Sequence, residues 1–401
     1  MMRAGPSQEE IRKHNLGTLL RHVHLGGPTS RAELTSLMGL NRSTIMALTA
    51  DLTAAGLVRE ELPRDTGRAG RPSLVVRPET ARVYVLAFEV GVDRLAAARI
   101  GLGGVILDRR EIVRERGPFD MGQVVGTLAG FARQMRRRTR DDTVCVGAAA
   151  AFCGAVRKSD GLVRSGPNIG AEEVPLAEEL SRRLQLGLPV SVGNDANLGA
   201  LAEHTRGVGM DCRDLVYLHG DVGIGGGVIV NGQLLGGHGG YGGEVGHMIV
   251  NPDGRPCGCG SRGCLEAEVG ERALMEHAGR YGEGRGRDGV RDVVDAADRG
   301  DVVAQGALQR VGGWLGLGVA NLVNIFNPEM VIFGGMLREI YLGSAAQVRS
   351  RIATGTLAAT REHVRLRTST LGDDATLMGA AEMAFARVLA DPLEALSRVA
   401  N

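Results

Sequence analysis

Glu244-Val-Gly-His247 and Cys257-Gly-Cys-Gly-Ser-Arg-Gly-Cys264-Leu-Glu266 place one histidine and three cysteines within a short part of the chain. Imidazole nitrogen and cysteine sulfur are donors that zinc prefers, and four such ligands complete a tetrahedral shell with no open position for a catalytic water. The two acids Glu244 and Glu266 bracket these donors, and we expect the metal to hold them in place. The pattern therefore predicts a structural Zn²⁺ site formed by His247, Cys257, Cys259 and Cys264.

Two other interpretations of the cysteines remain open. Three free thiols beside a chance histidine would need no metal, although Gly258, Gly260 and Gly263 suit a short loop that wraps one ion. A disulfide is disfavoured because the chain has only six cysteines in 401 residues and starts Met-Met-Arg-Ala-Gly-Pro, without an apolar signal core. We expect a reduced, cytoplasmic protein with no membrane partner, since no apolar run approaches membrane length.

Composition gives only weak limits on function. A length of 401 residues suits two or three domains, and 61 glycines against 3 % aromatic residues favour close backbone contacts over aromatic packing. The net charge is +1, but residues 1–80 carry 11 Lys and Arg against 8 Asp and Glu. This mild basic bias at the N-terminus is compatible with DNA binding and does not establish it.

The N-terminal segment shows the pattern of a helix-turn-helix. Apolar residues at helical spacing predict a first helix over residues 8–25. Ser30 and Glu33 have the spacing of a capping box at the start of a second helix, and Asn41 can cap a third, after a turn that contains Gly39. The start of the third helix would then face the DNA major groove. We therefore expect Arg42, Ser43 and Thr44 to contact the DNA.

A basic loop follows the three helices. Residues 57–60 and 73–76 have the composition of two paired strands, and the loop between them contains Arg68 and Arg71 among glycines. Such arginines can enter a narrow minor groove, so the segment predicts a winged helix-turn-helix over residues 1–80. The alternatives are a solvated linker between domains and a helical unit that contacts another protein.

From residue 82 the chain predicts an α/β architecture. Short β-branched strands alternate with helical segments, and polar residues collect where the strands end. Open α/β sheets bind their ligands at the carboxyl ends of their strands. We expect the strands at residues 83–88, 144–151, 189–192 and 215–218, with a glycine loop at 220–227.

Taken together, these motifs resemble the ROK family, the bacterial group of sugar kinases and sugar-responsive repressors, from about residue 10 to the end. The resemblance implies a two-lobed, actin-like and hexokinase-like (ribonuclease H-like) ATPase fold, with the lobes at residues 81–193 plus about 375–401 and at 194–374. The N-terminal unit is similar to that of the repressor branch. The resemblance rests on Pro167-Asn168, Asn194-Asp-Ala-Asn197, Gly223–Gly227, Glu244-x-x-His247, Cys257-x-Cys259-x4-Cys264-x-Glu266, and Asn327-Pro328 with Gly334-Gly335.

The same resemblance implies a sugar site between the lobes. Several oxygen acceptors and one amide discriminate between arrangements of sugar hydroxyls better than an apolar pocket does. The alternative for Asn194 and Asn197 is that they only cap the helix that follows. The sugar-binding residues implied by the resemblance are Gly154, Asn168, Asn194, Asp195, Glu244, His247 and Glu266.

Two loops argue against kinase activity. Asp195 matches the general base of the family's kinases, but their Asp-x-Gly-Gly-Thr loop is Glu89-Val-Gly-Val-Asp93 here, and Asp221-Val-Gly223 replaces Gly-Thr-Gly. One like-charge pair at about 4 Å costs roughly 4 kcal/mol at an effective dielectric constant near 20, so two carboxylates would oppose ATP. We predict that Asp195 is a general base that has lost its catalytic role. The protein would then be a sugar sensor rather than an enzyme.

The prediction for the whole chain is a sugar-responsive transcriptional regulator, most simply a repressor of carbohydrate genes. Its partners would be double-stranded operator DNA and a small-molecule sugar effector, and it would act as a homodimer or homotetramer because helix-turn-helix units usually bind two half-sites. The alternative is an ATP-dependent hexose or amino-sugar kinase fused to a DNA-binding domain. A third class, a scaffold without DNA affinity, would show no salt-sensitive DNA binding.

Overall fold

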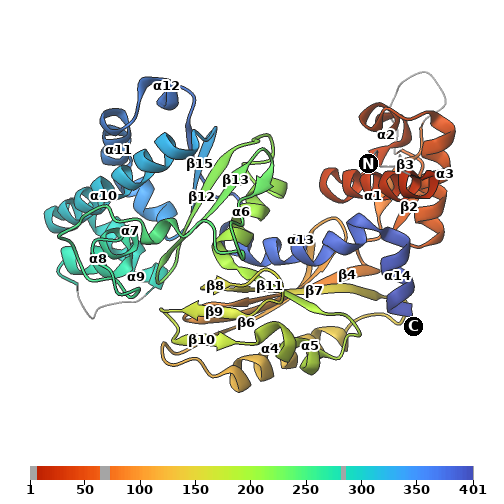
Figure 1. Cartoon of the computed structure of the whole chain (residues 1–401), viewed down its shortest axis with the longest axis horizontal. Coiled ribbons are helices and arrows are strands. Elements are labelled where there is room, and N and C mark those ends of the chain that lie inside the picture. Colours follow the sequence, from red (N-terminus) through yellow and green to blue (C-terminus); the bar gives the residue numbers. More distant parts are fainter. Residues whose placement is uncertain (1–6, 64–72, 281–285, 401) are drawn as a thin grey trace, which may run out of the picture.

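The computed structural model describes residues 7–63, 73–280 and 286–400. In these ranges the chain forms a small N-terminal unit of three helices and two five-stranded sheets, which lie in separate parts of the molecule (Figure 1). None of the helices in these ranges has the length and apolar character needed to cross a bilayer. The two five-stranded sheets and the helices between their strands confirm the α/β architecture that was expected after residue 82.

The N-terminal unit begins its helices where the sequence predicts. The Ser30 hydroxyl accepts from the Glu33 N–H while the Glu33 side chain accepts from the Ser30 N–H, and Asn41 caps the third helix. A further capping box at Ser7 was not predicted. Gly39 turns the chain between the second and third helices in the left-handed region, with φ 64°. The elements are α1 (Gln8–Gly26), β1 (Thr29–Ser30), α2 (Arg31–Met38), α3 (Arg42–Ala54), β2 (Val58–Glu61) and β3 (Val75–Pro78), with sheet order β1-β3-β2.

The first large sheet has the order β11-β7-β4-β5-β6, in which β11, β7 and β4 are parallel. Its central strands β4 and β7 are mostly apolar on both faces because helices cover both, whereas the edge strand β6 carries charged residues and is partly exposed. Leu86 and Phe88 pack toward α4 and α5, while Val85 and Ala87 pack toward α13. The elements are β4 (Val83–Val90), β5 (Arg94–Gly101), β6 (Val105–Val113), α4 (Met121–Arg136), β7 (Val144–Phe152), α5 (Leu176–Leu184), β11 (Val190–Asn194), α13 (Ala375–Ala390) and α14 (Pro392–Ala400). A small sheet of order β10-β9-β8 follows β7, with β8 (Ala155–Val156), β9 (Val163–Gly166) and β10 (Ala171–Val174).

The second large sheet has the order β14-β13-β12-β15-β16. Val216 and Leu218 pack toward the helices that include α10 and α11. Tyr217 packs toward α6 on the opposite face of the sheet. The elements are α6 (Asp195–Arg206), β12 (Leu215–Gly220), β13 (Ile224–Val230), β14 (Gln233–Leu234), η1 (Val245–His247), α7 (Leu265–Val269), α8 (Glu271–His277), α9 (Gly286–Asp298), α10 (Val302–Phe326), β15 (Met330–Gly335), α11 (Leu337–Gly355), α12 (Ala358–Arg361), β16 (Arg365–Thr368) and η2 (Gly372–Asp374).

The prediction of a glycine loop through residue 227 is wrong. The run Gly225, Gly226 and Gly227 belongs to strand β13. A Cβ atom at Gly226 would lie 2.3 Å from Val245 Cγ2, and one at Gly227 would lie 2.4 Å from Ala200 Cβ. These glycines let neighbouring elements approach the strand, which sequence periodicity does not reveal.

The N-terminal unit shares its hydrophobic core with the first large sheet. Leu19, Leu20 and Val23 of α1 belong to one buried cluster with Phe385 of α13. A Cβ atom at Gly17 would lie only 2.5 Å from the Leu389 carbonyl oxygen, so α1 packs directly against the end of α13. The three helices are therefore docked on the larger part of the molecule, beside α13 and α14 (Figure 1).

Candidate functional site

A cavity of about 290 Å³ lies where the ends of the two large sheets meet. Its walls come from the carboxyl end of β7, the small sheet, the start of α6, the β12–β13 turn and the segment around η1. All seven residues for which the sequence implied a sugar contact line this cavity: Gly154, Asn168, Asn194, Asp195, Glu244, His247 and Glu266. The structure thus brings together residues that are up to 112 positions apart in the chain, from 154 to 266.

The Asn194-Asp195 pair sits where β11 ends and α6 begins. Asn194 caps the helix, since its Oδ1 accepts from the Asn197 N–H at 2.9 Å. Its Nδ2 also donates to the Gly154 carbonyl at 3.1 Å and to Asp195 Oδ1 at 3.1 Å. Capping and a place in the cavity wall are therefore compatible for Asn194, whereas the Asn197 side chain is buried and its Nδ2 lies 3.5 Å from the Gly242 carbonyl.

Burial and negative neighbours change the protonation of this wall. Burial, together with the charges of Asp221, Glu89 and Glu244, raises the pKa of Asp195 to about 8, although the hydrogen bond from the Ala196 N–H acts in the opposite direction. Burial also raises the pKa of Glu244. Asp195 is consequently protonated at neutral pH, so its hydroxyl can donate a hydrogen bond as well as accept one.

The predicted metal ligands form a compact group. One donor atom from each of His247, Cys257, Cys259 and Cys264 lies within 4.8 Å of the others, and this group could hold a metal ion. The sulfur atoms of Cys259 and Cys264 are 3.7 Å apart, and Cys257 Sγ lies 3.7 Å from His247 Nδ1. A tetrahedron with Zn–S bonds of about 2.3 Å has S···S edges of roughly 3.8 Å, so the donor set and its spacing fit zinc.

Glu266 connects this group of donors to the cavity. One carboxylate oxygen accepts from the Ile224 N–H at 3.0 Å and from Asn168 Nδ2 at 3.4 Å. The other lies 3.7 Å from Cys257 Sγ. The position of this carboxylate therefore depends on the cysteine loop on one side and on the β12–β13 turn on the other.

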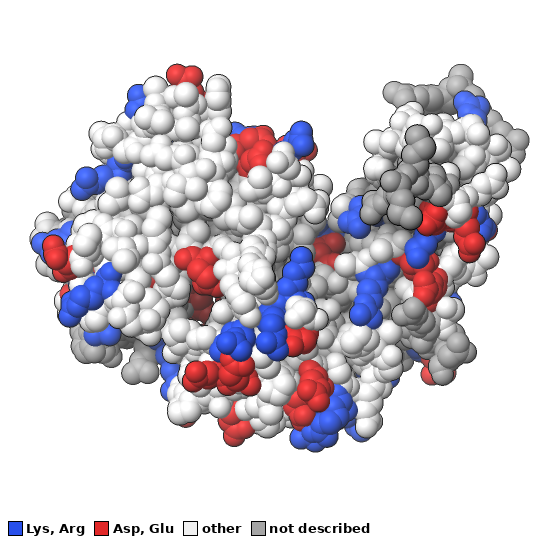
Figure 2. Space-filling view, viewed as in Figure 1, with Lys and Arg blue, Asp and Glu red and all other residues white. Residues whose placement is uncertain are grey.

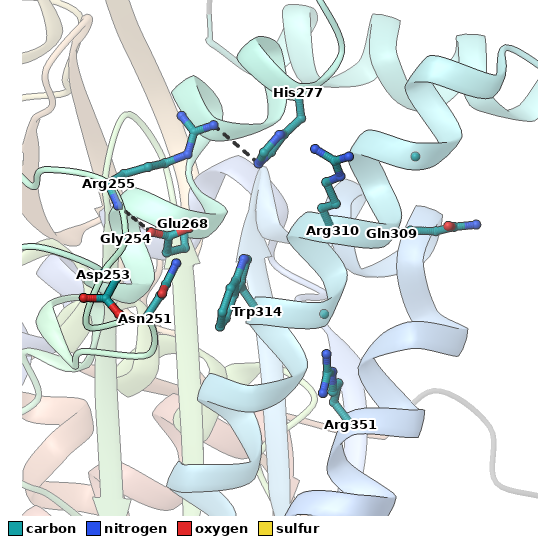
Figure 3. Close-up of a pocket in the computed structure, with 12 residues that line it drawn as sticks. Asn251, Asp253, Gly254, Arg255, Glu268, His277, Gln309, Arg310, Trp314 and Arg351 are labelled. Carbon is teal, nitrogen blue, oxygen red and sulfur yellow. Dashed lines mark hydrogen bonds between the residues drawn. The ribbon is translucent and has the colours of Figure 1, made fainter.

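The loop that precedes Cys257 is held in place by contacts with α7 and α8 (Figure 3). The Arg255 N–H donates to Glu268 at 2.7 Å, and the Arg255 guanidinium pairs with Glu276 and lies 3.4 Å from His277 Nε2. These groups border a second, more open hollow of about 880 Å³ between the loop and α10, into which Trp314 and Arg310 also face. The hollow lies outside the cavity that contains the predicted site.

The carboxylates next to the cavity differ from the expectation, because arginines neutralise them. Asp93 pairs with Arg116 at 3.0 Å, and Glu89 pairs with Arg94 at 2.5 Å. Burial, together with the charges of Asp93 and Glu89, raises the pKa of Asp221 to about 6, while Arg94 and Arg116 oppose the rise. The expected repulsion of a triphosphate is therefore reduced at Asp93, which pairs with Arg116, whereas Asp221 forms no ion pair with the described residues.

These ion pairs also join the two halves of the molecule. Arg116 donates to Glu271 on α8 at 2.9 Å while it holds Asp93. A phosphate placed among these groups would have to separate arginine from carboxylate and leave a buried charge unpaired, which is costly. The described acids in this region do not form a group that could hold a metal ion.

Several residues of the cavity wall were not predicted. His219 lies near the end of strand β12. Burial lowers its pKa to about 4, so its ring is neutral at pH 7. Its Nδ1 lies 3.1 Å from the Tyr217 hydroxyl. Alternation along β12 already places Tyr217 and His219 on one face, which is the signal that could have identified them. Other unpredicted lining residues are Val92, Cys153, Ser165 and Ile224.

The expected DNA contacts belong to the N-terminal unit and lie outside the cavity. Arg42 and Ser43 are exposed at the start of α3, and the Ser43 hydroxyl donates to Asn41 Oδ1 at 2.7 Å. Thr44 is half-buried, with its N–H bonded to the same Asn41 oxygen. Arg68 and Arg71 fall outside the residues that the structure describes.

An α/β fold with this cavity and cysteine group defines a sugar-kinase-like class of protein. The family model described as "ROK family" matches residues 85–387. The chain belongs to the ROK family, as its motifs predicted.

Similarity to individual proteins distinguishes two kinds of relative. The chain is 28 % identical over 374 residues to the xylose repressor of Bacillus spizizenii, covering 93 % of this chain and 95 % of that protein. The crystal structure of a ROK family transcriptional regulator, a homologue of the Escherichia coli MLC protein, matches with a TM-score of 0.79 and 27 % identity, covering 97 % of this chain and 99 % of that one. A ROK glucokinase from Streptomyces griseus, solved with glucose and AMPPNP, matches with a TM-score of 0.64 and 28 % identity over 75 % of this chain and 99 % of its own. The regulators thus match nearly the whole chain and the kinase about three quarters of it.

Proposed function

We propose that this chain is a sugar-responsive transcriptional repressor, in which the ROK region binds a sugar without phosphorylating it. The observation that carries the proposal is the combination of one polar cavity, lined by all seven expected residues, with a capped three-helix unit docked on the same body. The extent of the similarity to a xylose repressor supports this combination.

The DNA-binding part of the proposal concerns residues 1–80. Helices α2 and α3 with the Gly39 turn have the arrangement of a helix-turn-helix, and β2 and β3 pair antiparallel as a wing would. We assign DNA contacts to Arg42, Ser43 and Thr44 at the start of α3, and to Arg68 and Arg71 in the wing. A dimer or tetramer would place two such units on two half-sites of an operator, in the cytoplasm where chromosomal DNA is found.

The sugar-binding part concerns the cavity. A pocket lined by amide, carboxyl and imidazole groups suits an aldopyranose, whose hydroxyls both donate and accept. We propose the division into lobes at residues 81–193 plus about 375–401 and at 194–374, so that the cavity lies between them. Structural Zn²⁺ held by His247, Cys257, Cys259 and Cys264 would fix the Glu266 carboxylate against the sugar.

The absence of kinase activity is the third part of the proposal. The pairs of Asp93 with Arg116 and of Glu89 with Arg94 occupy the region next to the β4–β5 turn, where the family's kinases would need backbone amides for phosphate. A sugar kinase remains the second candidate, because Asp195 is in the cavity wall and a glucokinase structure matches three quarters of the chain.

One titration tests the proposal. Fluorescent DNA from upstream of the chain's own gene is bound at two salt concentrations, with and without D-xylose, D-glucose or N-acetyl-D-glucosamine. We expect salt-sensitive binding that at least one sugar weakens by about tenfold or more.

Three results would contradict separate parts of this proposal. DNA binding that ignores every sugar would remove the sensor and leave the DNA-binding protein. No salt-sensitive DNA binding at all would favour the scaffold class, and ATP-dependent phosphorylation of a sugar at enzyme-like rates would favour the kinase.

A further inference from the structure

Helix α6 connects the cavity to the N-terminal unit directly. It runs from Asp195, in the cavity wall, to Arg206, which contacts His24 of α1. Its 12 residues correspond to a length of about 18 Å at 1.5 Å per residue. One rigid element therefore has a sugar-facing end and an end that faces the proposed DNA-binding unit.

The middle of α6 is packed too closely to bend or slide freely. A Cβ atom at Gly379 of α13 would lie 1.9 Å from the Leu198 carbonyl oxygen, and one at Gly227 of β13 would lie 2.4 Å from Ala200. On the same helix, a Cβ at Gly199 would lie 2.5 Å from the Tyr217 ring. Displacement of one end of such a tightly packed helix has to appear at the other end or in its neighbours.

The end of α6 takes part in a buried polar cluster that joins four segments and is formed by Arg206, His24, Glu382 and Gly103. Arg206 Nε donates to Glu382 at 2.5 Å, and its Nη1 donates to the Gly103 carbonyl at 3.0 Å. The Gly103 N–H donates to His24 Nδ1 at 2.9 Å, while His24 Nε2 lies 3.2 Å from both Glu382 oxygens and 2.6 Å from Arg206 Nη2. His24 is fully buried, and Glu382 is 7 % exposed.

Charge in this cluster is balanced only while all its members are present. Burial lowers the pKa of His24, and the charges of Arg206 and Arg21 lower it further against Glu382. Burial opposes the ionisation of Glu382, but its hydrogen bonds with His24 and Arg206 and the positive charge of Arg206 lower its pKa overall. A movement of Arg206 would leave a buried carboxylate without its partner, and α1 would have to respond.

We infer that α6 and the Arg206–Glu382–His24 cluster transmit sugar binding to the DNA-binding unit. A sugar that contacts Asn194 and Asp195 shifts the start of α6, and Arg206 passes the shift to α1 through His24. This inference rests on the proposed function and names its route. Arg206, Glu382 and His24 are positioning residues, since they contact neither the cavity nor the expected DNA-contact residues.

The test compares two variants of the full-length protein. Arg206→Lys keeps the charge but cannot form the two-directional contacts of a guanidinium with Glu382 and Gly103. The matched control is Lys13→Met, which removes a 2.6 Å ion pair from α1 to Asp391 at the end of α13, away from α6. D-xylose and D-glucose affinities are measured by calorimetry, and operator affinity by fluorescence anisotropy with and without saturating sugar.

We expect the unmodified protein to change its operator Kd by about tenfold or more with sugar. Arg206→Lys should keep its sugar Kd and its sugar-free operator Kd within about twofold, while the sugar-induced change falls below about threefold. Lys13→Met should keep the full change. An equal response in Arg206→Lys and the unmodified protein overturns the route, and so does an equal loss in both variants.

A second measurement uses only the unmodified protein, so it tests the inference even if Arg206→Lys does not fold. Amide hydrogen exchange of the unmodified protein should change on sugar binding in α1, at residues 19–24, and at the end of α6. Unchanged exchange in both places overturns the inference. If the unmodified protein binds sugar but its operator affinity never changes, the proposed function fails and the route fails with it. If only the Arg206→Lys result is contrary, the proposed function stands.

Discussion

Asp195 is a carboxyl group whose surroundings disfavour its charge. In an unfolded chain it would ionise near its ordinary pKa of 3.8, but in the folded protein burial and nearby carboxylates raise its pKa to about 8. Its position at the start of α6 makes it both a cavity residue and the first residue of the helix that reaches the N-terminal unit.

The raised pKa predicts a pH-dependent stability. Between about pH 4 and pH 8 the unfolded chain has lost this proton and the folded chain retains it, so the free energy of unfolding falls as pH rises. Asp195→Asn should remove this fall, and its stability relative to the unmodified protein should increase from pH 5 to pH 8 in urea unfolding. Asp160→Asn is the control, because Asp160 is exposed with a pKa lowered to about 2 and is ionised throughout this range. A parallel pH dependence of Asp195→Asn and the unmodified protein would show that Asp195 is already ionised.

Loss of metal binding by the cysteine group should also weaken sugar binding in the cavity. Cys259→Ser replaces a thiolate donor by a hydroxyl, and we expect bound zinc to fall well below one per chain. Sugar affinity should fall by roughly tenfold, the scale seen when groups that orient a metal site are lost, because Glu266 lies between Cys257 and the cavity. Metal content and calorimetry check this, with Cys145→Ser in β7 as the control. Unchanged sugar affinity in a metal-free Cys259→Ser protein would separate the two sites.

At the scale of elements, local signals were reliable and non-local ones were not. The caps at Ser30 and Asn41 were predicted correctly because a cap involves residues only three positions apart. The partner of Asp93 was missed because Arg116 lies 23 positions further along the chain. The seven cavity residues were found through family motifs, since composition and periodicity alone do not show that residues 154 and 266 meet.

The same limit applies to glycines. Gly379→Ala would improve the helix propensity of α13, but its Cβ would lie 1.9 Å from the Leu198 carbonyl oxygen. We expect a net loss of about 1–3 kcal/mol in the free energy of unfolding, because backbone cannot move aside cheaply. Gly126→Ala on α4 is the matched control, since nothing lies within 4 Å of its added Cβ, and it should gain about 0.5–1 kcal/mol. Equal effects of the two substitutions in urea unfolding would contradict the close contact of α6 and α13.

Helix α3 carries the prediction for DNA. Arg42→Ala removes an exposed cation at the start of the helix, and we expect operator affinity to fall by about tenfold with a smaller dependence on salt. Arg12→Ala is the control, because Arg12 on α1 pairs with Asp51 at 2.6 Å and lies outside the expected contact residues. An anisotropy titration at two salt concentrations measures both. Equal effects of the two changes would mean that α3 does not face the DNA as proposed.

At the scale of the whole molecule, the N-terminal unit stands apart from the second-sheet half, with an open notch between them in the surface view (Figure 2). Among the described residues, α13 and α6 provide contact between the two. Ion pairs also connect the two halves next to the cavity, where Arg116 pairs both with Asp93, after β4, and with Glu271 at the start of α8. Movement of the second-sheet half is therefore coupled to charge pairs next to the cavity.

This arrangement predicts that the chain does not transfer phosphate. A kinase must place the triphosphate beside the sugar and neutralise it, but here arginines and carboxylates already satisfy one another at the β4–β5 turn. With Mg-ATP and D-glucose or D-xylose, a coupled assay should show no turnover above background, and ATP should leave sugar affinity unchanged. A ROK glucokinase assayed in parallel is the positive control. Turnover on the order of 1 per second, the lower end for typical enzymes, would show that these ion pairs open to admit ATP and that the chain is a kinase.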